Sequence, residues 1–268
     1  MDMSTDQLLA FKGVAVGLWF ALLFVGERLA PAAATARGWF GDWRRLAGNV
    51  GFWVINALLS LAVVVPVSAW AAHIDFGIMP AWGIRPAWLG GWPGLLVDLL
   101  LLDFLIYWWH RANHNVTLLW RFHEVHHLDQ FLDTTSAVRF HFGEILLSAG
   151  ARAVVIVLFQ IPLSSVLTFE ALVLAATLFH HSNVRLPAGV ERALSWIVVT
   201  PSIHWVHHHA IWRDTNSNYS TVLSLWDRLF GSRSATQRAR DMAIGTPGRS
   251  DLAWPRLVAS PFEPRPQG

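Results

Sequence analysis

The sequence predicts an all-α integral membrane protein of about four to five membrane helices that carry a helical cap. Three observations predict this fold. Hydrophobic residues make up 54% of the 268 residues and charged residues only 14%, whereas roughly a quarter of a soluble domain is charged. Several apolar stretches approach the ~20 residues that span a bilayer as a helix. Of the 13 histidines, all except His73 lie between residues 110 and 209, beyond the first two stretches.

Three apolar stretches in the first half of the chain are predicted membrane helices. The first, Leu8 to Val25, carries Lys12 near its outer edge, and the second, Leu46 to Ala72, contains no charged residue. The third runs from Trp88 to Trp109 and contains Asp103. The start of the chain, MDMSTDQ, lacks the basic residues of a secretory signal, so we expect the first stretch to be retained.

Two further stretches, Ile145–Ile161 and Leu163–Phe179, are predicted to form a hairpin hinged at Pro162. Each holds one charged residue, Arg152 or Glu170, at a similar distance from the hinge. An antiparallel pair would bring the two charges to the same depth, where an ion pair reduces the cost of burying either one. The alternative is a half-immersed hairpin whose charges reach water.

The arginines predict the orientation, because cytoplasmic connections carry an excess of basic residues. The 28–45 connection carries four arginines and the 73–87 connection only Arg85. The four are Arg28, Arg37, Arg44 and Arg45. We therefore expect an outside N-terminus, with the histidine stretch 110–141 and the C-terminal part in the cytoplasm. The predicted division is membrane helices over 1–92, a catalytic domain over 93–235, and a loosely ordered cytoplasmic tail over 236–268.

Charge and cysteine content exclude two kinds of site. The net charge is only +2 and the basic residues form no stripe, which argues against a nucleic-acid partner. The chain has no cysteine, so disulfides and thiolate metal sites are excluded.

Three histidine clusters predict a metal site. They are HRANH (His110, His114), HEVHH (His123, His126, His127) and HWVHH (His204, His207, His208). Helical residues three and four positions apart share a face, so each cluster presents a row of imidazoles, and all-nitrogen sites suit iron, zinc or copper. Further candidates are His141, His180 and His181. Eight to ten ligands are too many for one ion and about right for two.

A single HxxxH pattern is more often part of an ordinary helix face than a set of metal ligands. Two other histidines, His73 and His209, are expected to have no role in metal binding. His73 is expected at the membrane interface together with Trp70. His209 adjoins the third cluster but lies off its helical face. For His180 and His181 the helical phase does not decide which one faces the site.

From about Asp103 to Gly231 the chain resembles the fatty acid hydroxylase/sterol desaturase superfamily of integral membrane di-iron oxygenases. The matching motifs are DFLIYWWHRANH, FHEVHH, AVRFHFGEILLS, HHSNVRLP, TPSIHWVHHH and DTNSNYSTVLSLWDRLFGS. The resemblance implies a helical fold with a cytoplasmic metal-bearing cap and makes the histidines of all three clusters ligands. It favours His181 over His180, although more distant hydroxylases use the position of His180. His141 matches a histidine that many members have and others lack.

The resemblance also implies the reaction. Two Fe ions activate O2, two electrons arrive from an external donor, and a C–H bond of a lipid is hydroxylated or desaturated. The donor is a ferredoxin, a cytochrome b5-like protein or a reductase, and zinc can replace iron in purified protein. Fatty acyl, sterol, carotenoid and ether-lipid substrates all occur in the superfamily. The alternative function is a membrane protein that binds or transports a divalent metal without oxygenase activity.

Supporting residues are predicted as well, since a metal-bound histidine usually donates its other N–H to a carboxylate or carbonyl. Asp103 lies seven residues before His110, on the same helical face, and is predicted to orient a ligand imidazole. Glu144, Asn218 and Asp227 are further candidates. The chain carries no ER-retrieval signal and is rich in arginine, which favours the inner membrane of a bacterium.

Overall fold

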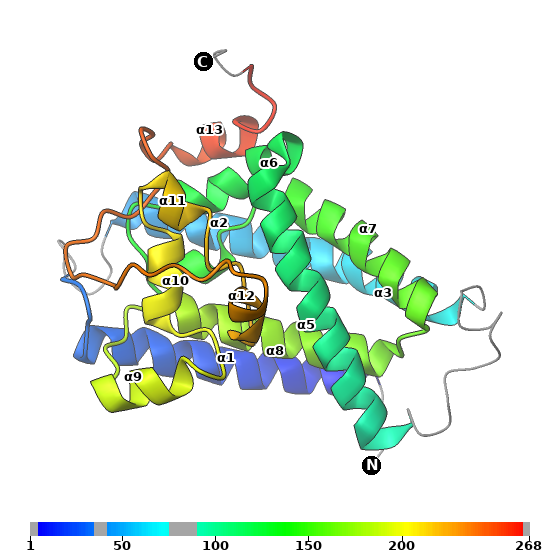
Figure 1. Ribbon diagram of the computed structural model, residues 1–268. Coiled ribbons are helices and arrows are strands. Elements are labelled where there is room, and N and C mark those ends of the chain that lie inside the picture. The colour runs from blue at the N-terminus through cyan, green and yellow to red at the C-terminus, as the bar shows by residue number, and fades with distance from the viewer. Residues whose placement is uncertain (1–4, 35–41, 75–89, 265–268) are drawn as a thin grey trace.

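Five long apolar helices dominate the structure, a computed structural model that describes residues 5–34, 42–74 and 90–264. They are long and apolar enough to cross a membrane and cover Asp6–Leu29, Trp43–His73, Gly91–Asn115, Phe142–Phe159 and Leu163–His181. In Figure 1 these helices form one bundle, and the shorter helices gather at one of its ends. The described residues form isolated bridges but no sheet. The predicted all-helical membrane fold is confirmed.

The described helices are of two kinds, long membrane helices and short helices that follow the third or the fifth long helix in the chain. The long ones are α1 (Thr5–Leu29), the continuous run α2 (Trp43–Leu59), η1 (Ser60–Val64) and α3 (Val65–His73), then α5 (Gly91–Asn115), α7 (Phe142–Phe159) and α8 (Leu163–His181). The short ones are α6 (Thr117–His127), η3 (Ser136–Val138), α9 (Ala188–Leu194), α10 (Pro201–His207), α11 (Trp212–Thr215), α12 (Leu225–Leu229) and α13 (Trp254–Ala259). The predicted start of the third span, Trp88, lies outside the described residues, as do Arg37 and Arg85.

The second membrane helix widens into a π-helical turn at η1, where the N–H of Val65 bonds to the carbonyl of Ser60. Pro66 follows directly and has no N–H to donate to the preceding turn. A wider turn beside a proline is a common way for a helix to absorb the missing bond. The helix continues as α3 and reaches His73.

The hairpin of α7 and α8 turns where the sequence predicts. Helix α7 ends at Phe159, and Gln160 adopts a left-handed conformation with φ of 49°. Pro162 then precedes the first residue of α8. The core between these helices, α3 and α5 includes Leu102, Ile156 and Phe169, all almost fully buried.

The predicted ion pair within the hairpin is confirmed and has a third member. Arg152 Nη2 lies 3.4 Å from Glu170 Oε1, and Lys12 Nζ of α1 lies 2.8 Å from Glu170 Oε2. The three charges tie α1, α7 and α8 together at one depth of the bundle, and each is largely buried.

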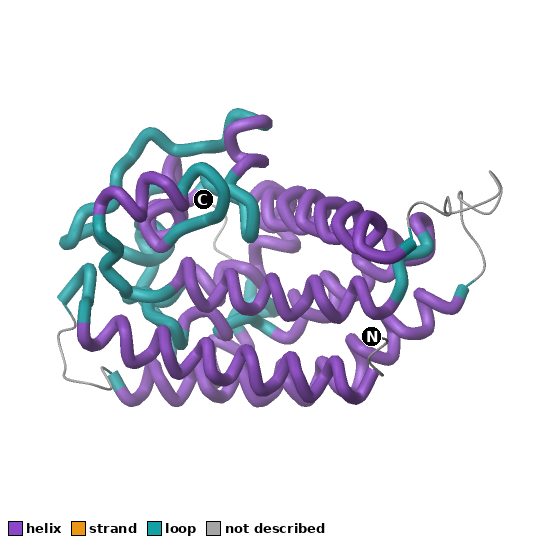
Figure 2. The backbone as a smooth tube through the Cα atoms, turned by 90° about the horizontal axis from the view of Figure 1, so that it is seen from below, coloured by secondary structure: helices purple, strands orange, loops and turns teal. Residues whose placement is uncertain are grey.

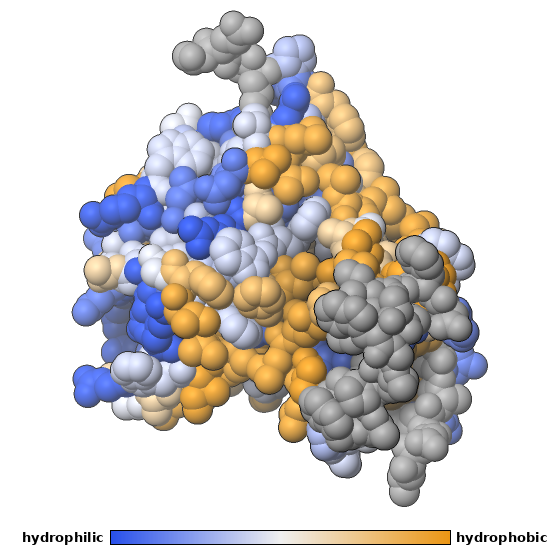
Figure 3. Space-filling view, turned by 45° about the vertical axis from the view of Figure 1, so that its right-hand side comes forward, coloured by the Kyte–Doolittle hydropathy of each residue, from blue (hydrophilic) through white to orange (hydrophobic). Residues whose placement is uncertain are grey.

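The surface separates into an apolar band and a polar cap. Exposed apolar side chains on the bundle include Phe11, Leu18 and Leu61, each more than 60% exposed. Figure 3 shows hydrophobic residues gathered over the bundle and hydrophilic residues over the cap. Figure 2 shows the long helices running side by side, with many of the loops at the cap end. This is the distribution expected of a bundle immersed in lipid with one end in water.

The C-terminal segment departs from the prediction of a loosely ordered tail. Helix α13 buries Leu257 against Phe52 and Leu128, and Ile244 packs near Trp205. Asp251 pairs with the buried Arg139. Apolar residues spaced between the prolines supply enough buried contact to dock this segment on α2 and α6.

Candidate metal centre

Histidines from four helices meet where the bundle joins the cap. The last turns of α5, the C-terminal half of α6, the last residue of α8 and the end of α10 supply them. The first group contains His110, His114, His123, His127 and His207, and the second contains His126, His181, His204 and His208. Within each group all ligand atoms lie within 4.8 Å of one another. Two separate groups are consistent with a site for two metal ions.

The two HxxHH clusters divide between the groups in the same way. His123 and His127, one helical turn apart, enter the first group, while His126 enters the second. His204 and His208 enter the second group, while His207 enters the first. With 3.6 residues per turn, the i+3 and i+4 side chains lie on either side of residue i and point about 100° apart around the helix. The prediction that each cluster presents a single row is therefore too simple, because each cluster contributes to both groups.

In the second group, the free ring nitrogens point at one another. His181 Nε2 lies 3.0 Å from the Nε2 atoms of both His126 and His204. His181 Nδ1–H donates to the carbonyl of Thr177 at 2.8 Å and His126 Nδ1–H to that of Arg139 at 3.2 Å. Carbonyls accept and never donate, so both Nε2 atoms carry lone pairs.

Two lone pairs that face each other at 3.0 Å repel unless a cation lies between them. Nitrogens bound about 2.1 Å from one ion and at right angles would be about 3.0 Å apart. The spacing and the tautomers of the second group therefore fit a metal ion. His208 Nε2, 3.1 Å from His204 Nε2, belongs to the same set.

The first group is oriented by one carboxylate and two carbonyls. His123 Nδ1–H donates to Glu144 Oε1 at 2.9 Å. His110 and His207 donate from Nδ1 to the carbonyls of Tyr219 at 2.8 Å and Ser217 at 2.6 Å. The remaining Nε2 of His207 is buried without a hydrogen-bond partner among the described residues. Such partners fix the ring and raise the basicity of a metal ligand.

Burial and crowding keep these imidazoles neutral. Burial, and then the neighbouring imidazoles, hold the pKa values of the cap histidines well below their ordinary value. These are His126, His127, His204, His207 and His208. A metal ligand has to be deprotonated, so the site is in its ligating form at neutral pH.

Two candidate histidines lie outside both groups. His141 Nδ1 accepts from the N–H of Gly143 at 3.0 Å and its Nε2–H donates to the carbonyl of Val258 at 3.1 Å. Nδ1 thus caps α7 and Nε2 is bonded to α13. The centre of the His180 ring lies 3.9 Å from that of the His204 ring, yet it is His181 that joins the second group.

The described hydrogen bonds of Asp103, predicted to orient a ligand imidazole, go to the segment that leads into α12. Its carboxylate accepts from the N–H groups of Val222 and Leu223, at 3.3 and 3.1 Å, and from Trp226 Nε1 at 2.8 Å. The side chain therefore leaves α5 toward the segment before α12. Asp103 and His110 are seven residues apart and therefore share a face of α5. The sequence does not show that the segment before α12 lies closer to the Asp103 carboxylate than an imidazole does.

Asp227 and Asn218 shape the loop that carries two of the accepting carbonyls. Asp227 accepts from the N–H groups of Tyr219 and Ser220, at 2.8 and 3.0 Å. Asn218 has a left-handed φ of 52°, and its amide donates to the carbonyl of Ile203 at 3.1 Å. Neither has a described hydrogen bond to an imidazole. Both hold the backbone from which Tyr219 accepts the N–H of His110.

Two buried charged residues around the centre were not predicted. Glu27, beyond the predicted end of the first span, accepts from the N–H groups of Thr134 and Asn183, each at 2.9 Å. Arg45 binds Asp129 at 2.5 Å and Asp133 at 2.7 Å. Both fasten the loop after α6 to the membrane helices. The acidic residues were visible after HEVHH, but nothing in the sequence identified their distant partner.

The fold and the two imidazole groups define a membrane protein with a paired all-nitrogen metal centre. The chain matches the fatty acid hydroxylase family over residues 95–232, about half of its length. The chain therefore belongs to the fatty acid hydroxylase family, an oxidoreductase family of membrane lipid hydroxylases. The resemblance inferred from the motifs is confirmed.

Similar proteins include three lipid enzymes. Ornithine lipid hydroxylase OlsE from Rhizobium tropici is 27% identical over 276 residues, covering 96% of this chain and 80% of the relative. Alkylglycerol monooxygenase from Xenopus tropicalis is 32% identical over 149 residues, covering 56% and 32%. Very-long-chain aldehyde decarbonylase GL1-6 from Oryza sativa subsp. indica is 28% identical over 209 residues, covering 70% and 30%. No solved structure matches the chain.

Proposed function

We propose that this chain is a di-iron oxygenase that hydroxylates a C–H bond of a membrane lipid. The observation that carries the proposal is the pair of buried imidazole groups whose lone pairs converge. One oxygen atom of O2 enters the C–H bond and the other leaves as water. This balance consumes two electrons and two protons, supplied by a separate ferredoxin, cytochrome b5-like protein or reductase.

The histidines of the two groups would hold the two ions, and His141 would remain a helix cap. Iron, when bound, supplies the oxidant for an unactivated C–H bond, which side chains alone cannot provide. Zinc would occupy the same nitrogens without supplying it. Here Glu144 keeps His123 in the tautomer that ligates, and the loop held by Asp227 does the same for His110.

The relatives support a polar lipid as the substrate. The hydroxylase of ornithine lipids aligns with nearly the whole chain, whereas the monooxygenase of alkylglycerols aligns with about half. We therefore propose hydroxylation, rather than desaturation, of a lipid with an amino-acid headgroup. The protein would lie in the inner membrane of a bacterium with the histidine centre and C-terminus in the cytoplasm. Residues 93–235 would form the catalytic unit.

Metal content and product formation test this proposal together. Protein grown in iron-57 and purified anaerobically should contain about two irons per chain, spin-coupled after oxidation in the Mössbauer spectrum. With a reductant and 18O2, ornithine lipid should gain one 18O atom. His126→Ala should lose iron and product, whereas His209→Ala should keep both, because His209 bonds to Asp214 outside the centre. One ion per chain, or zinc alone after growth in iron, would contradict the proposal and favour a non-catalytic metal protein.

A further inference from the structure

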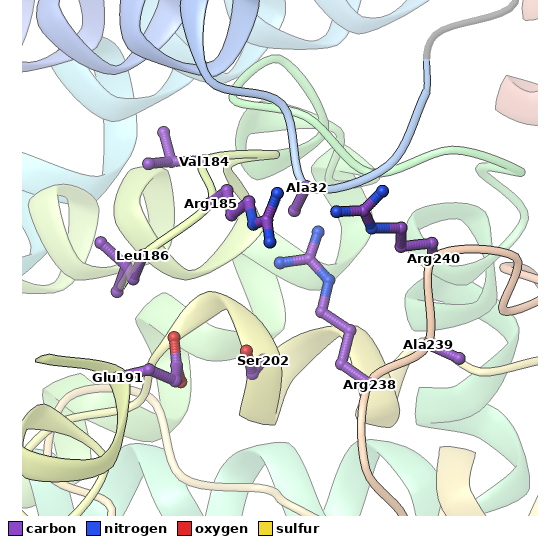
Figure 4. A pocket seen from close by; sticks show the side chains of 9 residues that line it. All are labelled: Ala32, Val184, Arg185, Leu186, Glu191, Ser202, Arg238, Ala239 and Arg240. Carbon is purple, nitrogen blue, oxygen red and sulfur yellow. The ribbon is translucent and has the colours of Figure 1, made fainter. Parts of the chain in front are cut away.

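Three arginines surround a small pocket beside the cap end of α1 (Figure 4). The guanidinium groups of Arg185, Arg238 and Arg240 approach one another across it, and Glu191 lies on another wall. The pocket has a volume of about 150 Å³. Pockets for drug-sized ligands measure roughly 300–1,000 Å³, so this one fits a headgroup rather than a whole lipid.

The pocket lies at the level where the membrane helices end. Ala32, on its wall, follows the last residue of α1 by three positions, and Arg185 follows the last residue of α8 by four. Farther along, Trp196 and Ile197 after α9 are 67% and 62% exposed. Exposed tryptophan beside an apolar bundle is typical of the membrane–water interface. The pocket therefore opens where lipid headgroups are found.

Within the described residues, none of the three arginines forms an ion pair with a carboxylate, and Glu191 acts on Arg238 only from beyond ion-pair distance. Arg238 is half-buried, stacks 3.7 Å from the ring centre of Trp205 and donates to Asn183 Oδ1 at 3.3 Å. A partly desolvated cation without an anion is costly. Guanidinium forks match carboxylate and phosphate oxygens, so the missing partner has the chemistry of an oxyanion.

Glu191 adds a second requirement. Its Oε1 is buried and accepts no hydrogen bond from the described residues. Burial lowers the pKa of the Arg238 guanidinium to about 10, and the charge of Glu191 offsets part of that lowering. A carboxylate on the wall of an arginine pocket suits an ammonium group on the same ligand as the oxyanion.

Resting on the lipid hydroxylase function proposed above, we propose that this pocket holds the headgroup of the substrate lipid. The arginines bind its carboxylate or phosphate, and Glu191 binds its ammonium group. Arg238 bonds to Asn183, two residues after His181, and stacks on Trp205, next to His204. A headgroup anchored here is held beside the second histidine group, so the acyl chain can approach the centre. Ornithine, which carries a carboxylate and an ammonium group, satisfies both requirements.

Lipid binding to the full chain in detergent tests the proposal. The probes are ornithine lipid, phosphatidylglycerol and diacylglycerol with matched acyl chains, titrated and counted by native mass spectrometry. The double variant Arg185→Gln/Arg240→Gln should bind the two charged lipids at least tenfold more weakly and diacylglycerol unchanged. Both arginines are exposed, so the fold should tolerate their replacement. Glu191→Gln should weaken ornithine lipid alone.

Arg213→Gln is the matched control, because this exposed arginine lies on the cap away from the pocket. Wild-type binding by the double variant, or equal binding of diacylglycerol and ornithine lipid by the native chain, would overturn the proposal. Displacement of the lipid by micromolar sodium phosphate would assign the pocket to a free anion and also overturn it. Iron content and 18O incorporation are measured separately, so arginine-dependent binding without oxygenase activity would refute only the proposed reaction.

Discussion

Five of the nine rings in the centre have their hydrogen placed by a partner outside the centre. Glu144 does this for His123, and backbone carbonyls do it for His126, His181 and His207. The Nε2 atoms are then left to face inward before any ion arrives. Preorganisation of this kind lowers the cost of gathering neutral ligands at one point.

Glu144→Gln should weaken metal binding at the first group by about 10- to 100-fold, the usual effect of losing the partner of a ligating histidine. The amide can still meet the imidazole but provides no negative charge to raise its basicity. Iron retention after dialysis against a chelator measures the effect. Glu124→Gln is the control, because Glu124 lies in α6 next to His123 but pairs with Arg249 instead of an imidazole. Equal retention in the two variants would remove Glu144 from this role.

Acid should release the metal and destabilise the metal-free protein. The pKa values of the cap histidines are lowered in the fold, so the unfolded chain binds more protons once the pH falls below the ordinary histidine value of about 6.5. The free energy of unfolding of the metal-free form should therefore rise with pH up to that value and level off above it. Thermal unfolding at pH 5, 6 and 7.5 checks the sign. Greater stability at pH 5 would contradict the assignment of neutral, buried rings.

The sequence predicted which residues belong to the metal centre better than it predicted how they are arranged. The i, i+3, i+4 spacing and the motif matches identified every histidine that the two groups contain. They did not show that neighbours such as His126 and His127 serve different groups, because that depends on where α8 and α10 lie. Asp103 illustrates the same limit, since helical phase indicates a face but not the partner opposite it.

At the scale of elements, the hairpin of α7 and α8 is where sequence and structure agree most closely. Pro162 predicted the turn, and similar distances from it predicted the pairing of Arg152 with Glu170. Lys12 was seen as a lone charge near a helix end, because its partner lies 158 residues away. Local patterns predict contacts within a hairpin, whereas contacts between distant helices require the packed bundle.

Glu170→Gln should cost more stability than either cation substitution. It leaves both Lys12 and Arg152 buried without an anion, and removing one side of a buried pair costs about 3–5 kcal/mol. Arg152→Leu leaves Glu170 its closer partner, Lys12, and should cost less. Unfolding in mixed micelles of increasing sodium dodecyl sulfate fraction measures the difference. Equal costs for the two variants would show that the pair with Lys12 does not hold in the membrane.

At the scale of the whole molecule, the two ends of the bundle differ. The described histidines of both groups, the arginine pocket and the short helices lie at one end, and the α7–α8 turn lies at the other (Figure 1). The docked tail adds to the same end through Leu257 and Asp251. One end thus gathers the parts that would meet a water-borne electron donor, while the other meets only the opposite surface of the membrane.

The absence of cysteine allows a direct test of orientation. A single cysteine at Arg213, 81% exposed on the cap, should react with a membrane-impermeant maleimide in inverted vesicles and stay unlabelled in intact spheroplasts. Ser164→Cys, exposed at the start of α8, should show the reverse. Labelling of both positions from the same side would refute the predicted topology.

The distribution of the ligands along the chain also bears on how the protein is made. His110 to His127 leave the ribosome long before His204, His207 and His208, yet each group needs members of that last set. Neither group can be completed until synthesis has passed α10, by which time the five apolar helices have already entered the bilayer. Loading of either group with metal would therefore follow the synthesis of α10.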